Sequence, residues 1–349
     1  MKKARCVCHR REAGVDALVL ATDVAMATNQ TTSPTVTQPK SAERRGSSPG
    51  RDEARNTGTT RLGKLSVAGR ETMILVTAAT GQYGRLVVEA LLQKAASKDL
   101  AVAVRHPEKA RDWRARGVSV RQADYDDLSS LHAAFEGIND LLFISSPEFD
   151  TPTRMAQHER VIEGAKRGKV RHVAYTSFLG AQNEQPGGFN AHYLTERALE
   201  KSGLTTTFLR HPFYTDSLVN QGLVQDAIAT GRLRDASGGK AVNTASRADL
   251  AVAAAAVLTG SGEKGKPVEF TGTPWTFAQL GEAIGRATGG SIAIERIPSS
   301  EAGPYGWLFD LIAAGLYERE TPDLARLIGR KPTSLDDFVA SLVRTTSRP

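Results

Sequence analysis

Cysteine is nearly absent from this 349-residue sequence, and long hydrophobic runs are missing altogether. The two cysteines, Cys6 and Cys8, both lie close to the first residue, so residues 73–349 contain none. That long segment therefore holds neither a disulfide framework nor a thiolate metal site. No stretch reaches 18 consecutive apolar residues, which argues against a membrane-spanning helix. Hydrophobic residues make up 40% and charged residues 24% of the chain, which is ordinary globular composition.

Residues 73–349 also lack a strong excess of charge of either sign. The formal net charge is +7 at pH 7. Residues 1–72 hold 13 basic and 7 acidic side chains, whereas residues 73–349 hold 32 and 31. Since nearly all the basic excess lies outside the long C-terminal segment, the composition disfavours a polyanion-binding fold, and we expect no nucleic-acid partner.

The first 72 residues differ from the rest of the chain in composition. Residues 29–72 are rich in Thr, Ser, Arg and Gly, contain no aromatic residue and show no periodicity. Such a segment cannot bury enough apolar surface to offset its ordering entropy. Residues 14–28 weakly imitate a signal peptide, but two aspartates interrupt the apolar stretch. We therefore predict that residues 1–72 are a disordered N-terminal extension of a cytoplasmic protein and that Met73 is a natural start.

From Met73 onward, short apolar runs alternate with amphipathic stretches. Strands are predicted at Ile74–Thr77, Leu100–Val104, Val118–Gln122, Asp140–Ser145, His172–Thr176 and Thr205–Leu209. Helices are predicted between them at Arg85–Ala96, Pro107–Arg116, Leu128–Phe135, Met155–Arg167 and Ala191–Ser202. Near-continuously apolar strands separated by helices are typical of a parallel sheet that is covered on both faces.

The predicted fold class is therefore α/β, a Rossmann-like doubly wound parallel sheet over residues 73–349. A small C-terminal α/β substrate lobe is expected from about residue 260 onward. We expect this lobe to contain the last helices together with Val268–Phe270, Phe277–Thr288 and Ile292–Ile297.

A glycine-containing loop follows the first predicted strand and opens the first predicted helix. Its sequence is Thr77-Ala78-Ala79-Thr80-Gly81-Gln82-Tyr83-Gly84. Gly81 allows the backbone to approach a pyrophosphate, and Gly84 allows the helix to pack closely on the strand. The helix N-terminus adds free N–H donors and the positive end of its dipole. The alternative is an ordinary strand-to-helix turn, but the strand–loop–helix context favours a dinucleotide phosphate site.

The residues after the second and third predicted strands indicate which dinucleotide binds. An NAD site has an acidic residue about 20 residues after the loop to hold the ribose 2′-hydroxyl, but this chain has Arg105. A guanidinium suits a 2′-phosphate, so the sequence favours NADPH over NADH; the alternative is a solvated surface arginine. After the third strand, Asp124 is placed to accept from the adenine amino group, with Tyr125 as a flat wall. Helix capping by Asp126 is an equally good use of the acids there.

Nine short motifs occur in the order and spacing of one family. They are VTAATGQYG, AVRHPEKA, VRQADYDD, LLFISS, HVAYTS, HYLTE, FLRHPFY, SRADLA and EFTGTPWTFAQL. With them the chain resembles the NmrA-like atypical short-chain dehydrogenase/reductases from Met73 to about Leu342. Within that family it is most similar to the bacterial NAD(P)H:quinone oxidoreductases, and next to the triphenylmethane dye reductases.

The resemblance implies a role for residues of four segments. It implies that the pyrophosphate is wrapped by Ala78, Ala79, Thr80, Gly81, Gln82 and Tyr83. It further implies that Arg105 holds the 2′-phosphate and that Ser145 and Ser146 lie beside the cofactor. It implies a nicotinamide site lined by His211, Pro212, Phe213 and Tyr214. The family usually has Gly in place of Ala78 and Asn-Gly in place of His211-Pro212, so the turn must tolerate a Cβ and the nicotinamide contacts depart from the family pattern.

The tyrosine–lysine pair of an ordinary short-chain dehydrogenase is missing. In that pair lysine lowers the pKa of a tyrosine, which passes a proton to the carbonyl, but no tyrosine here has a lysine four residues later. By the family pattern the two positions are His192 and Glu196. His192 is predicted to deliver a proton or bind a quinone oxygen, paired with Glu196 on one helix face. The alternative is an exposed pair of little consequence.

The missing pair constrains the reaction. Alcohol dehydrogenation needs a base, whereas an electrophilic acceptor such as a quinone or a cationic dye needs mainly hydride placement, and solvent can complete the protonation. No flavin is required, because the nicotinamide carries the hydride. We predict an NADPH-dependent, flavin-independent reductase of quinones or similar small acceptors, with no metal. The alternative is a non-catalytic NADP(H)-sensing regulator that binds a partner protein, and the oligomeric state stays open.

Overall fold

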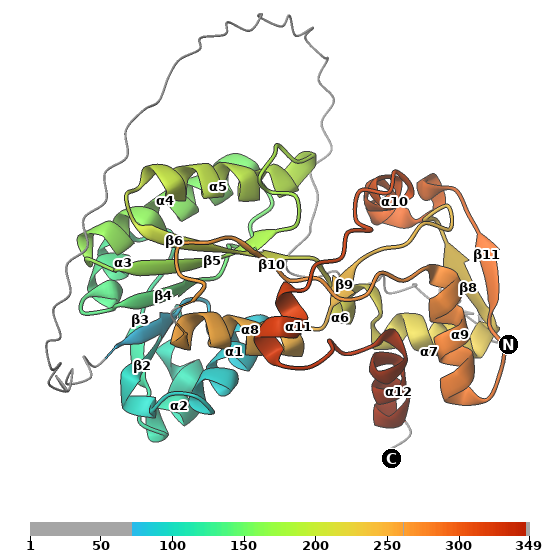
Figure 1. The fold of residues 1–349 in the computed structure, drawn as a ribbon, viewed down its shortest axis with the longest axis horizontal. Coiled ribbons are helices and arrows are strands. Elements are labelled where there is room, and N and C mark those ends of the chain that lie inside the picture. Colours follow the sequence, from blue (N-terminus) through green and yellow to red (C-terminus); the bar gives the residue numbers. More distant parts are fainter. Residues whose placement is uncertain (1–71, 261, 347–349) are drawn as a thin grey trace, which may run out of the picture. The chain divides into compact units, whose positions relative to one another are not determined.

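The computed structural model describes residues 72–260 and 262–346, which form a seven-stranded sheet with helices on both faces (Figure 1). The strands of this sheet are β1 (Ile74–Val76), β2 (Leu100–Val104), β3 (Ser119–Gln122), β4 (Asp140–Phe143), β5 (His172–Phe178), β6 (Thr205–His211) and β10 (Val268–Glu269). Their order is β10-β6-β5-β4-β1-β2-β3, and each neighbouring pair is parallel. The predicted doubly wound parallel sheet is confirmed. The disorder predicted for the N-terminal extension falls outside the described residues, apart from Thr72.

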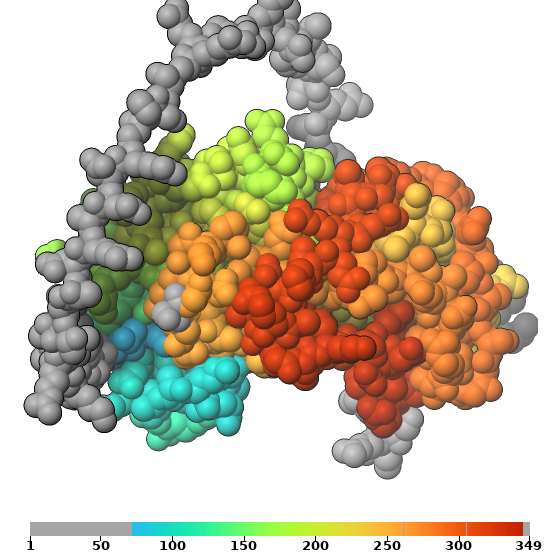
Figure 2. Space-filling model, in the orientation of Figure 1, coloured from blue at the N-terminus to red at the C-terminus, as the bar shows by residue number. Residues whose placement is uncertain are grey.

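Two sets of helices cover the sheet. One face carries α1 (Gln82–Leu92), α2 (Arg111–Ala115), α8 (Arg247–Thr259) and α11 (Asp323–Ile328). The other face carries α3 (Leu128–Phe135), α4 (Thr151–Arg167) and α5 (Asn190–Lys201). Figure 2 shows α8, in orange, and α11, in red, side by side on the face in view. Because each face closes its own apolar core, the strands between them are apolar on both sides. Within these two ranges no helix is long and apolar enough to cross a membrane.

The agreement between predicted and observed boundaries differs from element to element. Strand β2 and helix α3 match their predictions residue for residue. Helix α4 starts four residues before the predicted Met155, because the Asp150 side chain caps it by accepting a bond from the Thr153 N–H. Strands β5 and β6 run two residues further than predicted, to Phe178 and His211, which pair with each other at the carboxyl end of the sheet.

A third apolar core lies beyond the carboxyl ends of β5 and β6. Its helices are α6 (Thr215–Leu218), α7 (Gln221–Thr230), α9 (Phe277–Thr288), α10 (Gly306–Ala313) and α12 (Leu335–Thr346). Its strands form two parallel pairs, β7 (Phe213–Tyr214) with β9 (Thr244–Ala245) and β8 (Arg232–Asp235) with β11 (Ala293–Arg296). Short 3₁₀ turns complete the connections, at Ser97–Asp99, Pro107–Ala110, Gly187–Phe189, Ser299–Glu301 and Gly303–Tyr305.

The path of the chain through this lobe differs from the prediction of a start near residue 260. The chain enters the lobe directly after β6, returns to the sheet for α8 and β10, and leaves again at α9. Helix α8 stays with the sheet because it is apolar nearly all round, and its buried side chains join the core beneath α1. The predicted lobe strand at Val268–Phe270 is likewise the edge strand β10 of the main sheet.

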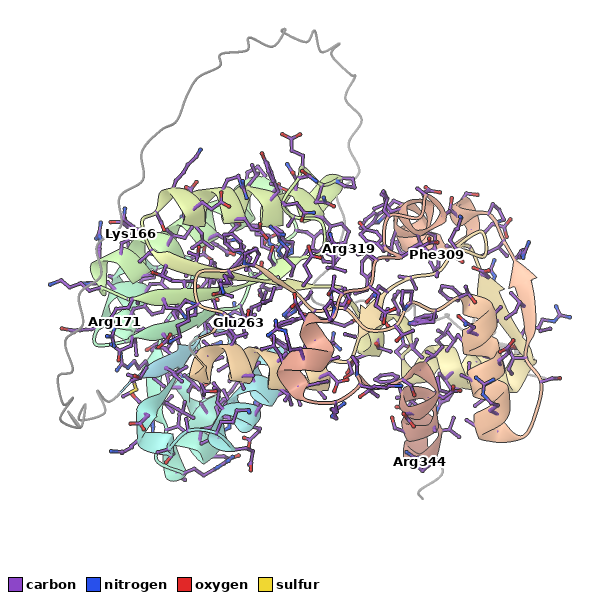
Figure 3. The ribbon with its side chains drawn as sticks, viewed as in Figure 1. Lys166, Arg171, Glu263, Phe309, Arg319 and Arg344 are labelled. Carbon is purple, nitrogen blue, oxygen red and sulfur yellow. The ribbon has the colours of Figure 1, made fainter. Side chains whose placement is uncertain are left out.

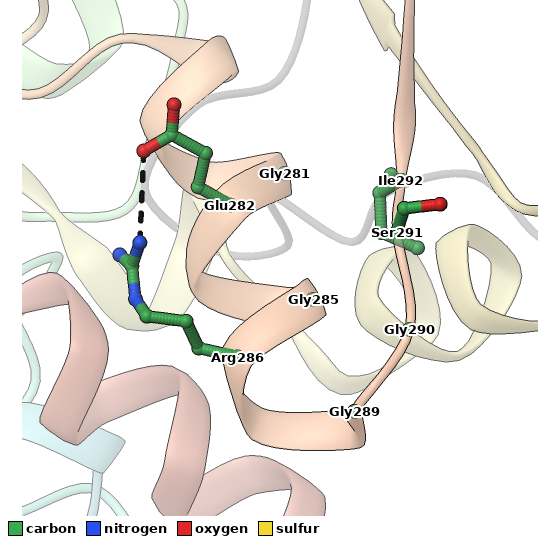
Figure 4. Close-up of a pocket in the computed structure, with 8 residues that line it drawn as sticks. All are labelled: Gly281, Glu282, Gly285, Arg286, Gly289, Gly290, Ser291 and Ile292. Carbon is green, nitrogen blue, oxygen red and sulfur yellow. Dashed lines mark ion pairs between the residues drawn. The ribbon is translucent and has the colours of Figure 1, made fainter.

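Helix α9 carries a glycine stripe that lets the following segment pack against it (Figure 4). A Cβ at Gly281 would lie 2.8 Å from a side-chain carbon of β11, and one at Gly285 would lie 2.8 Å from the carbonyl oxygen of Gly290. The backbone contact at Gly285 therefore requires glycine, whereas a Cβ at Gly281 would require the end of the Ile294 side chain to move. The shallow cavity beside them has a volume of about 470 Å³, and its charged lining residues, Glu282 and Arg286, form an ion pair with each other at 3.6 Å. The stripe serves helix packing, and we assign no ligand to it.

A buried polar cluster lies toward the amino ends of β4, β5 and β6, and we call it the amino-end cluster (Asp140, His172, Thr207 and Lys264). Asp140 accepts from His172 Nδ1 at 2.8 Å and from Lys264 Nζ at 2.5 Å. His172 Nε2 lies 2.9 Å from Thr207 Oγ1. Burial alone would raise the pKa of Asp140, but the hydrogen bonds from His172 and Lys264 outweigh it and hold the pKa below its usual value. The cluster thus pairs its buried carboxylate with two donors.

The loop that carries Lys264 is fastened to the sheet and to α11. Thr207 donates its hydroxyl proton to the carbonyl of Glu263 at 3.0 Å. The Glu263 side chain, labelled in Figure 3, pairs with Arg326 of α11 at 2.6 Å. Arg326 also pairs with Asp323 at 2.8 Å. These contacts tie three elements together at the amino edge of the sheet.

Candidate cofactor and substrate site

Two adjoining cavities lie at the carboxyl ends of β1 and β4, where the strand order reverses and open α/β sheets bind ligands. The larger, of about 410 Å³, is lined by the predicted site residues Ala78, Thr80, Gly81, Gln82, Tyr83, Arg105, Asp124, Ser145 and Ser146. The smaller, of about 90 Å³, is lined by the predicted site residues Tyr83, Ser145, His192, His211, Pro212, Phe213 and Tyr214. Ala79, the remaining predicted residue, is fully buried. The structure thus gathers nearly all predicted residues around two connected spaces.

The loop between β1 and α1 is a tight turn that brings its backbone to the larger cavity. Ala78 has a φ of +47°, in the left-handed region, which costs a residue with a Cβ about 1 kcal/mol. Its carbonyl oxygen accepts from the Gly81 N–H at 3.0 Å, and a Cβ at Gly84 would lie 2.6 Å from the same oxygen. The close helix packing predicted for Gly84 is therefore confirmed. The Tyr83 hydroxyl turns away from the loop and donates to the carbonyl of Leu250 at 3.3 Å, which fastens α1 to α8.

The N-terminus of α1 lines the larger cavity, where its first backbone N–H groups have no partner within the helix. Its N-cap residue, Gly81, makes no side-chain bond to the helix, and the first turn contains no acidic residue. The first N–H groups of a helix have no partner within the helix, and the positive end of the dipole lies there. A pyrophosphate fits this donor set. The residues present therefore fit a dinucleotide.

Arg105 follows β2 and borders the same cavity. Its side chain is exposed, and it makes no ion pair with any residue of the described ranges. The guanidinium is therefore available to a phosphate group of a ligand in the cavity. This position fits the predicted 2′-phosphate contact, which stays a prediction.

The acidic residues in the turn after β3 make hydrogen bonds that differ in part from the prediction. Asp124 lines the larger cavity, and its Oδ1 accepts from the Asp126 N–H at 3.1 Å. Tyr125 also lines this cavity, and its hydroxyl lies 2.6 Å from the carbonyl oxygen of Ile144. Helix α3 is capped by Asp127, whose side chain accepts from the Ser129 N–H. The predicted cap at Asp126 is therefore wrong, because the chain needs one more residue before it turns into the helix.

Ser145 and Ser146 follow β4 and are both buried. The Ser145 hydroxyl lies 3.2 Å from the Tyr175 hydroxyl and accepts from Arg154 Nη2 at 2.5 Å. The Ser146 N–H donates to His158 Nε2 at 3.0 Å. Since both serines are already bound to protein partners, they border a ligand with fixed side chains. We call Ser145, Arg154, His158, Tyr175 and His192 the carboxyl-end cluster.

The segment His211–Tyr214 lines the smaller cavity. The His211 ring stacks on Phe270 with centroids 5.6 Å apart, and its Nδ1 lies 3.2 Å from the Tyr214 hydroxyl. Its Nε2 is buried without a hydrogen-bond partner in the described part of the chain. Burial lowers the pKa of His211 to about 3, so the ring is neutral at physiological pH. This neutral nitrogen beside the cavity leaves a hydrogen-bonding position for a ligand.

The predicted pair between His192 and Glu196 does not form, and neither side chain is exposed. Their residues are 9% and 0% exposed. Glu196 accepts two bonds from Arg210 of β6, at 2.7 and 3.0 Å, and one from the Ser177 hydroxyl at 2.6 Å. A buried carboxylate is stabilised by charge-assisted donors of this kind, which a neutral imidazole does not provide. The four-residue spacing on the helix therefore predicted a side-chain contact between His192 and Glu196 that the structure does not contain.

His192 instead contacts Tyr175 and Arg154. Its Nδ1 lies 3.0 Å from the Tyr175 hydroxyl, and its Nε2 lies 3.0 Å from Arg154 Nη2. Because arginine only donates, Nε2 must accept and Nδ1 carries the ring proton. Burial, and then the charge of Arg154, hold the pKa of His192 well below its usual value. A neutral ring in this orientation has no proton to deliver into the cavity, and a contact to an acceptor oxygen stays a prediction.

Arg154 is the residue of this site that the sequence did not reveal. It lies in the first turn of α4, is 4% exposed and lines the smaller cavity. In the sequence it is one of several basic residues on an amphipathic helix, where such residues usually face solvent. No local signal marks it, because the groups around it come from β4, β5 and α5.

Comparison with known proteins agrees with this geometry. Residues 78–260 match the model of the NAD(P)H-binding family. The chain is 34% identical over 286 residues to quinone oxidoreductase 2 of Escherichia coli, an alignment that covers 77% of this chain and 98% of that protein. It is 29% identical over 296 residues to an NmrA-like family domain-containing oxidoreductase of Aspergillus flavus, covering 77% of this chain and 94% of that protein.

Two solved structures are similar in fold and in sequence. The triphenylmethane reductase of Citrobacter sp. complexed with NADP(H) has a TM-score of 0.74 and 34% identity, covering 77% of this chain and 99% of that one. The NADPH-dependent quinone oxidoreductase of Escherichia coli complexed with NADPH has a TM-score of 0.71 and 34% identity, with the same coverage. The family model spans more than half of this chain, and these relatives are covered almost completely. The chain therefore belongs to the NAD(P)H-binding family of NmrA-like oxidoreductases.

Proposed function

We propose that this protein is an NADPH-dependent, flavin-independent reductase that transfers hydride to quinones or similar electrophilic acceptors. The observation that carries the proposal is the junction of the two cavities at Ser145. One is a groove with a phosphate-binding loop and a free arginine, and the other is a small aromatic space next to it. The names of the relatives, a quinone oxidoreductase and a triphenylmethane reductase, support a reductase of this kind.

In this proposal each predicted segment has one task in holding the cofactor. The backbone of Ala78–Tyr83 and the start of α1 bind the pyrophosphate, and Arg105 binds the 2′-phosphate. Ser145 and Ser146 border the middle of the cofactor. The segment His211–Tyr214 borders the nicotinamide, where the unpartnered His211 Nε2 is a candidate partner for the carboxamide.

The smaller cavity would hold the acceptor against aromatic walls. Phe178 stacks on Phe189 with centroids 4.4 Å apart, and Phe213 meets Phe178 edge-on at 5.1 Å. Apolar rings of this kind suit a flat acceptor and exclude water around it. Bound NADPH supplies the hydride, so the protein needs only to place the acceptor ring correctly.

The protein groups at this cavity do not include an acid that titrates near neutral pH. The pKa values of His192 and His211 are lowered by burial, and burial raises the pKa of Tyr175. Proton delivery from the chain is therefore weak in this site, and solvent completes the reaction. That chemistry suits an acceptor that is already electrophilic and does not suit an alcohol or a ketone that needs acid catalysis.

Steady-state NADPH oxidation by the full chain tests the proposal. The protein is first freed of any flavin and shown by its absorbance to contain none. We expect turnover with benzoquinone and menadione without added flavin. Tight NADP binding with no turnover across the acceptor panel would contradict the proposal and favour a sensor of NADP(H).

A further inference from the structure

Arg154 is a buried cation without a carboxylate. Among the described residues its guanidinium has two polar contacts, both through Nη2, to the Ser145 hydroxyl at 2.5 Å and to His192 Nε2 at 3.0 Å. Its Nε is buried with no hydrogen-bond partner, and no acidic side chain of the described ranges forms an ion pair with it. The positively charged guanidinium of Arg154 therefore has two neutral hydrogen-bond partners, Ser145 and His192.

Arg210, a second buried arginine, has the carboxylate partners that Arg154 lacks among the described residues. Arg210 is bound by both oxygens of Glu196 and lies 3.5 Å from Glu269. A charge taken out of water is stable when an opposite charge and hydrogen bonds replace the lost hydration. Arg210 has this compensation within the protein, whereas Arg154 lacks it. Arg154 is therefore open to an opposite charge from outside the described residues.

The position of Arg154 separates it from the cofactor phosphates. It lines the smaller cavity with Phe178 and Phe189, and it is not among the residues that line the larger cavity with the phosphate-binding loop. It also lies in the first turn of α4, where the helix dipole adds to the positive potential. The acceptor end of the site is therefore electropositive.

We propose, on the basis of the proposed function, that Arg154 binds the acceptor oxygen that becomes anionic on reduction. The site would accordingly select neutral quinones over cationic dyes. A neutral quinone that receives a hydride becomes a hydroquinone monoanion while NADPH becomes NADP⁺, and one proton from solvent then gives the hydroquinone. The guanidinium stabilises the negative charge as it develops, which lowers the barrier more than it strengthens quinone binding. A cationic dye starts with a charge that the guanidinium repels and loses that charge on reduction.

Ser145 and His192 are positioning residues in this arrangement. Both accept from the same nitrogen, Nη2, and so fix the plane of the guanidinium while leaving Nη1 for the acceptor. The His192 Nδ1–H is in turn directed to the Tyr175 hydroxyl. This assigns to His192 the task of orienting Arg154, which explains why a histidine occupies the family's tyrosine position without acting as an acid.

Two variants of the full chain and one control test the proposal. Arg154→Met removes the charge and keeps much of the volume, and Arg154→Lys keeps the charge. Arg167→Met is the control, since Arg167 lies on the same helix, is exposed and pairs only with Glu163. NADPH affinity and thermal unfolding of each variant are measured first. Unchanged NADPH affinity in Arg154→Met shows that the cofactor site is intact.

The kinetic readout is menadione reduction by NADPH. We expect kcat to fall roughly 10- to 100-fold in Arg154→Met with a smaller change in KM, as for loss of an oxyanion-binding donor. Arg154→Lys should recover a large part of kcat, and Arg167→Met should match the wild type. An unchanged kcat in Arg154→Met, or a rise in KM alone, would overturn the proposal.

A binding readout separates this proposal from the proposed function. The probes are 2-hydroxy-1,4-naphthoquinone, which is anionic at neutral pH, and malachite green, a cationic dye, each titrated in the presence of NADP⁺. Arg154→Met should weaken binding of the anion roughly 10- to 100-fold and leave binding of the dye unchanged or stronger. Equal weakening of both probes, or of neither, would contradict the role of Arg154. Wild-type protein that shows this charge selectivity but does not oxidise NADPH with any quinone would contradict the proposed function alone.

Discussion

The two buried polar clusters, at opposite ends of the same strands, use a basic side chain in opposite ways. In the amino-end cluster, the Asp140 carboxylate binds His172 and the Lys264 ammonium, so the lysine charge has an opposite charge within the protein. In the carboxyl-end cluster, the polar contacts of Arg154 within the described ranges are the Ser145 hydroxyl and the neutral His192 ring. One cluster is complete within the protein, and the other has an excess of positive charge.

The difference separates a buried charge that stabilises the fold from a buried charge that is open to a ligand. A buried charge that has its partner within the chain contributes to one folded arrangement, and removing the partner is costly. A buried charge without a partner is held in place by the rest of the fold, and a ligand can complete it. The carboxyl ends of the strands are also where the larger cavity lies, so the incomplete cluster lies at the edge where open α/β sheets bind ligands.

The largest expected effect comes from breaking the complete cluster. Asp140→Ala leaves His172 and Lys264 without their carboxylate and should lower the free energy of unfolding by about 3 kcal/mol. Urea unfolding measures this loss. NADPH affinity of the folded variant should equal that of the wild type, since Asp140 lies at the far edge of the sheet. A loss of affinity without a loss of stability would contradict the division between the two clusters.

The next effect concerns the exposed arginine of the cofactor groove. Arg105→Ala should weaken NADPH binding about 10- to 150-fold, equivalent to roughly 1.5–3 kcal/mol for charge-assisted hydrogen bonds, and barely change NADH binding. Arg114→Ala, an exposed arginine on α2, is the matched control. Titration of both cofactors into each variant decides the matter. Equal losses for the two cofactors would mean that Arg105 supports the loop and does not bind the phosphate.

His211, beside the smaller cavity, and the amino-end cluster should also respond to acid in different pH windows. His211 beside the smaller cavity has a folded pKa of about 3, below its unfolded value of about 6.5, so the unfolded chain binds more protons as the pH falls through 6.5. The neutral ring should therefore cost about 1.4 kcal/mol of stability between pH 7.5 and 5.5. Asp140 has a lowered pKa, so its contribution is present above its unfolded value of about 3.9 and is lost only at lower pH.

The variant His211→Asn isolates this contribution. The difference in unfolding free energy between pH 7.5 and 5.5 should shrink by about 1.4 kcal/mol relative to the wild type. Chemical unfolding of the variant and the wild type at the two pH values measures it. An equal pH dependence in wild type and His211→Asn would show that the ring is protonated in the folded state.

The smallest expected effect is the stability change on removing the unpaired charge. Arg154→Met loses two hydrogen bonds but also removes a buried guanidinium that has no opposite charge, so the unfolding free energy should change by less than about 1 kcal/mol. Arg210→Met is the informative comparison, because it leaves Glu196 buried without its arginine and should cost about 3 kcal/mol. Similar losses in the two variants would mean that Arg154 is paired in a way the described residues do not show.

The sequence predicts what is local and periodic in this protein. Strand β2, helix α3 and the loop around Gly84 follow from apolar runs, helical spacing and glycine placement. It also predicts most residues that line the larger cavity, because they follow the ends of consecutive parallel strands. The lobe boundary was missed because α8 and β10 return to the sheet, and such a return depends on which apolar surfaces meet in three dimensions.

The chemistry of the acceptor site was harder to predict, for a similar reason. Helical spacing suggested that His192 pairs with Glu196, but Glu196 is taken by Arg210, which lies on a different element. Arg154 gave no signal, since a surface arginine and a buried one look alike in a helix. Partners that come from separate strands and helices become visible only in the folded chain.

Turnover per folded molecule, compared between Arg154→Met and Asp140→Asn, tests the central claim most directly. Menadione reduction is measured with saturating NADPH, at a temperature where both variants are folded. The account predicts wild-type kcat for Asp140→Asn and a roughly 10- to 100-fold lower kcat for Arg154→Met. Wild-type kcat in Arg154→Met together with a large loss in Asp140→Asn would contradict it.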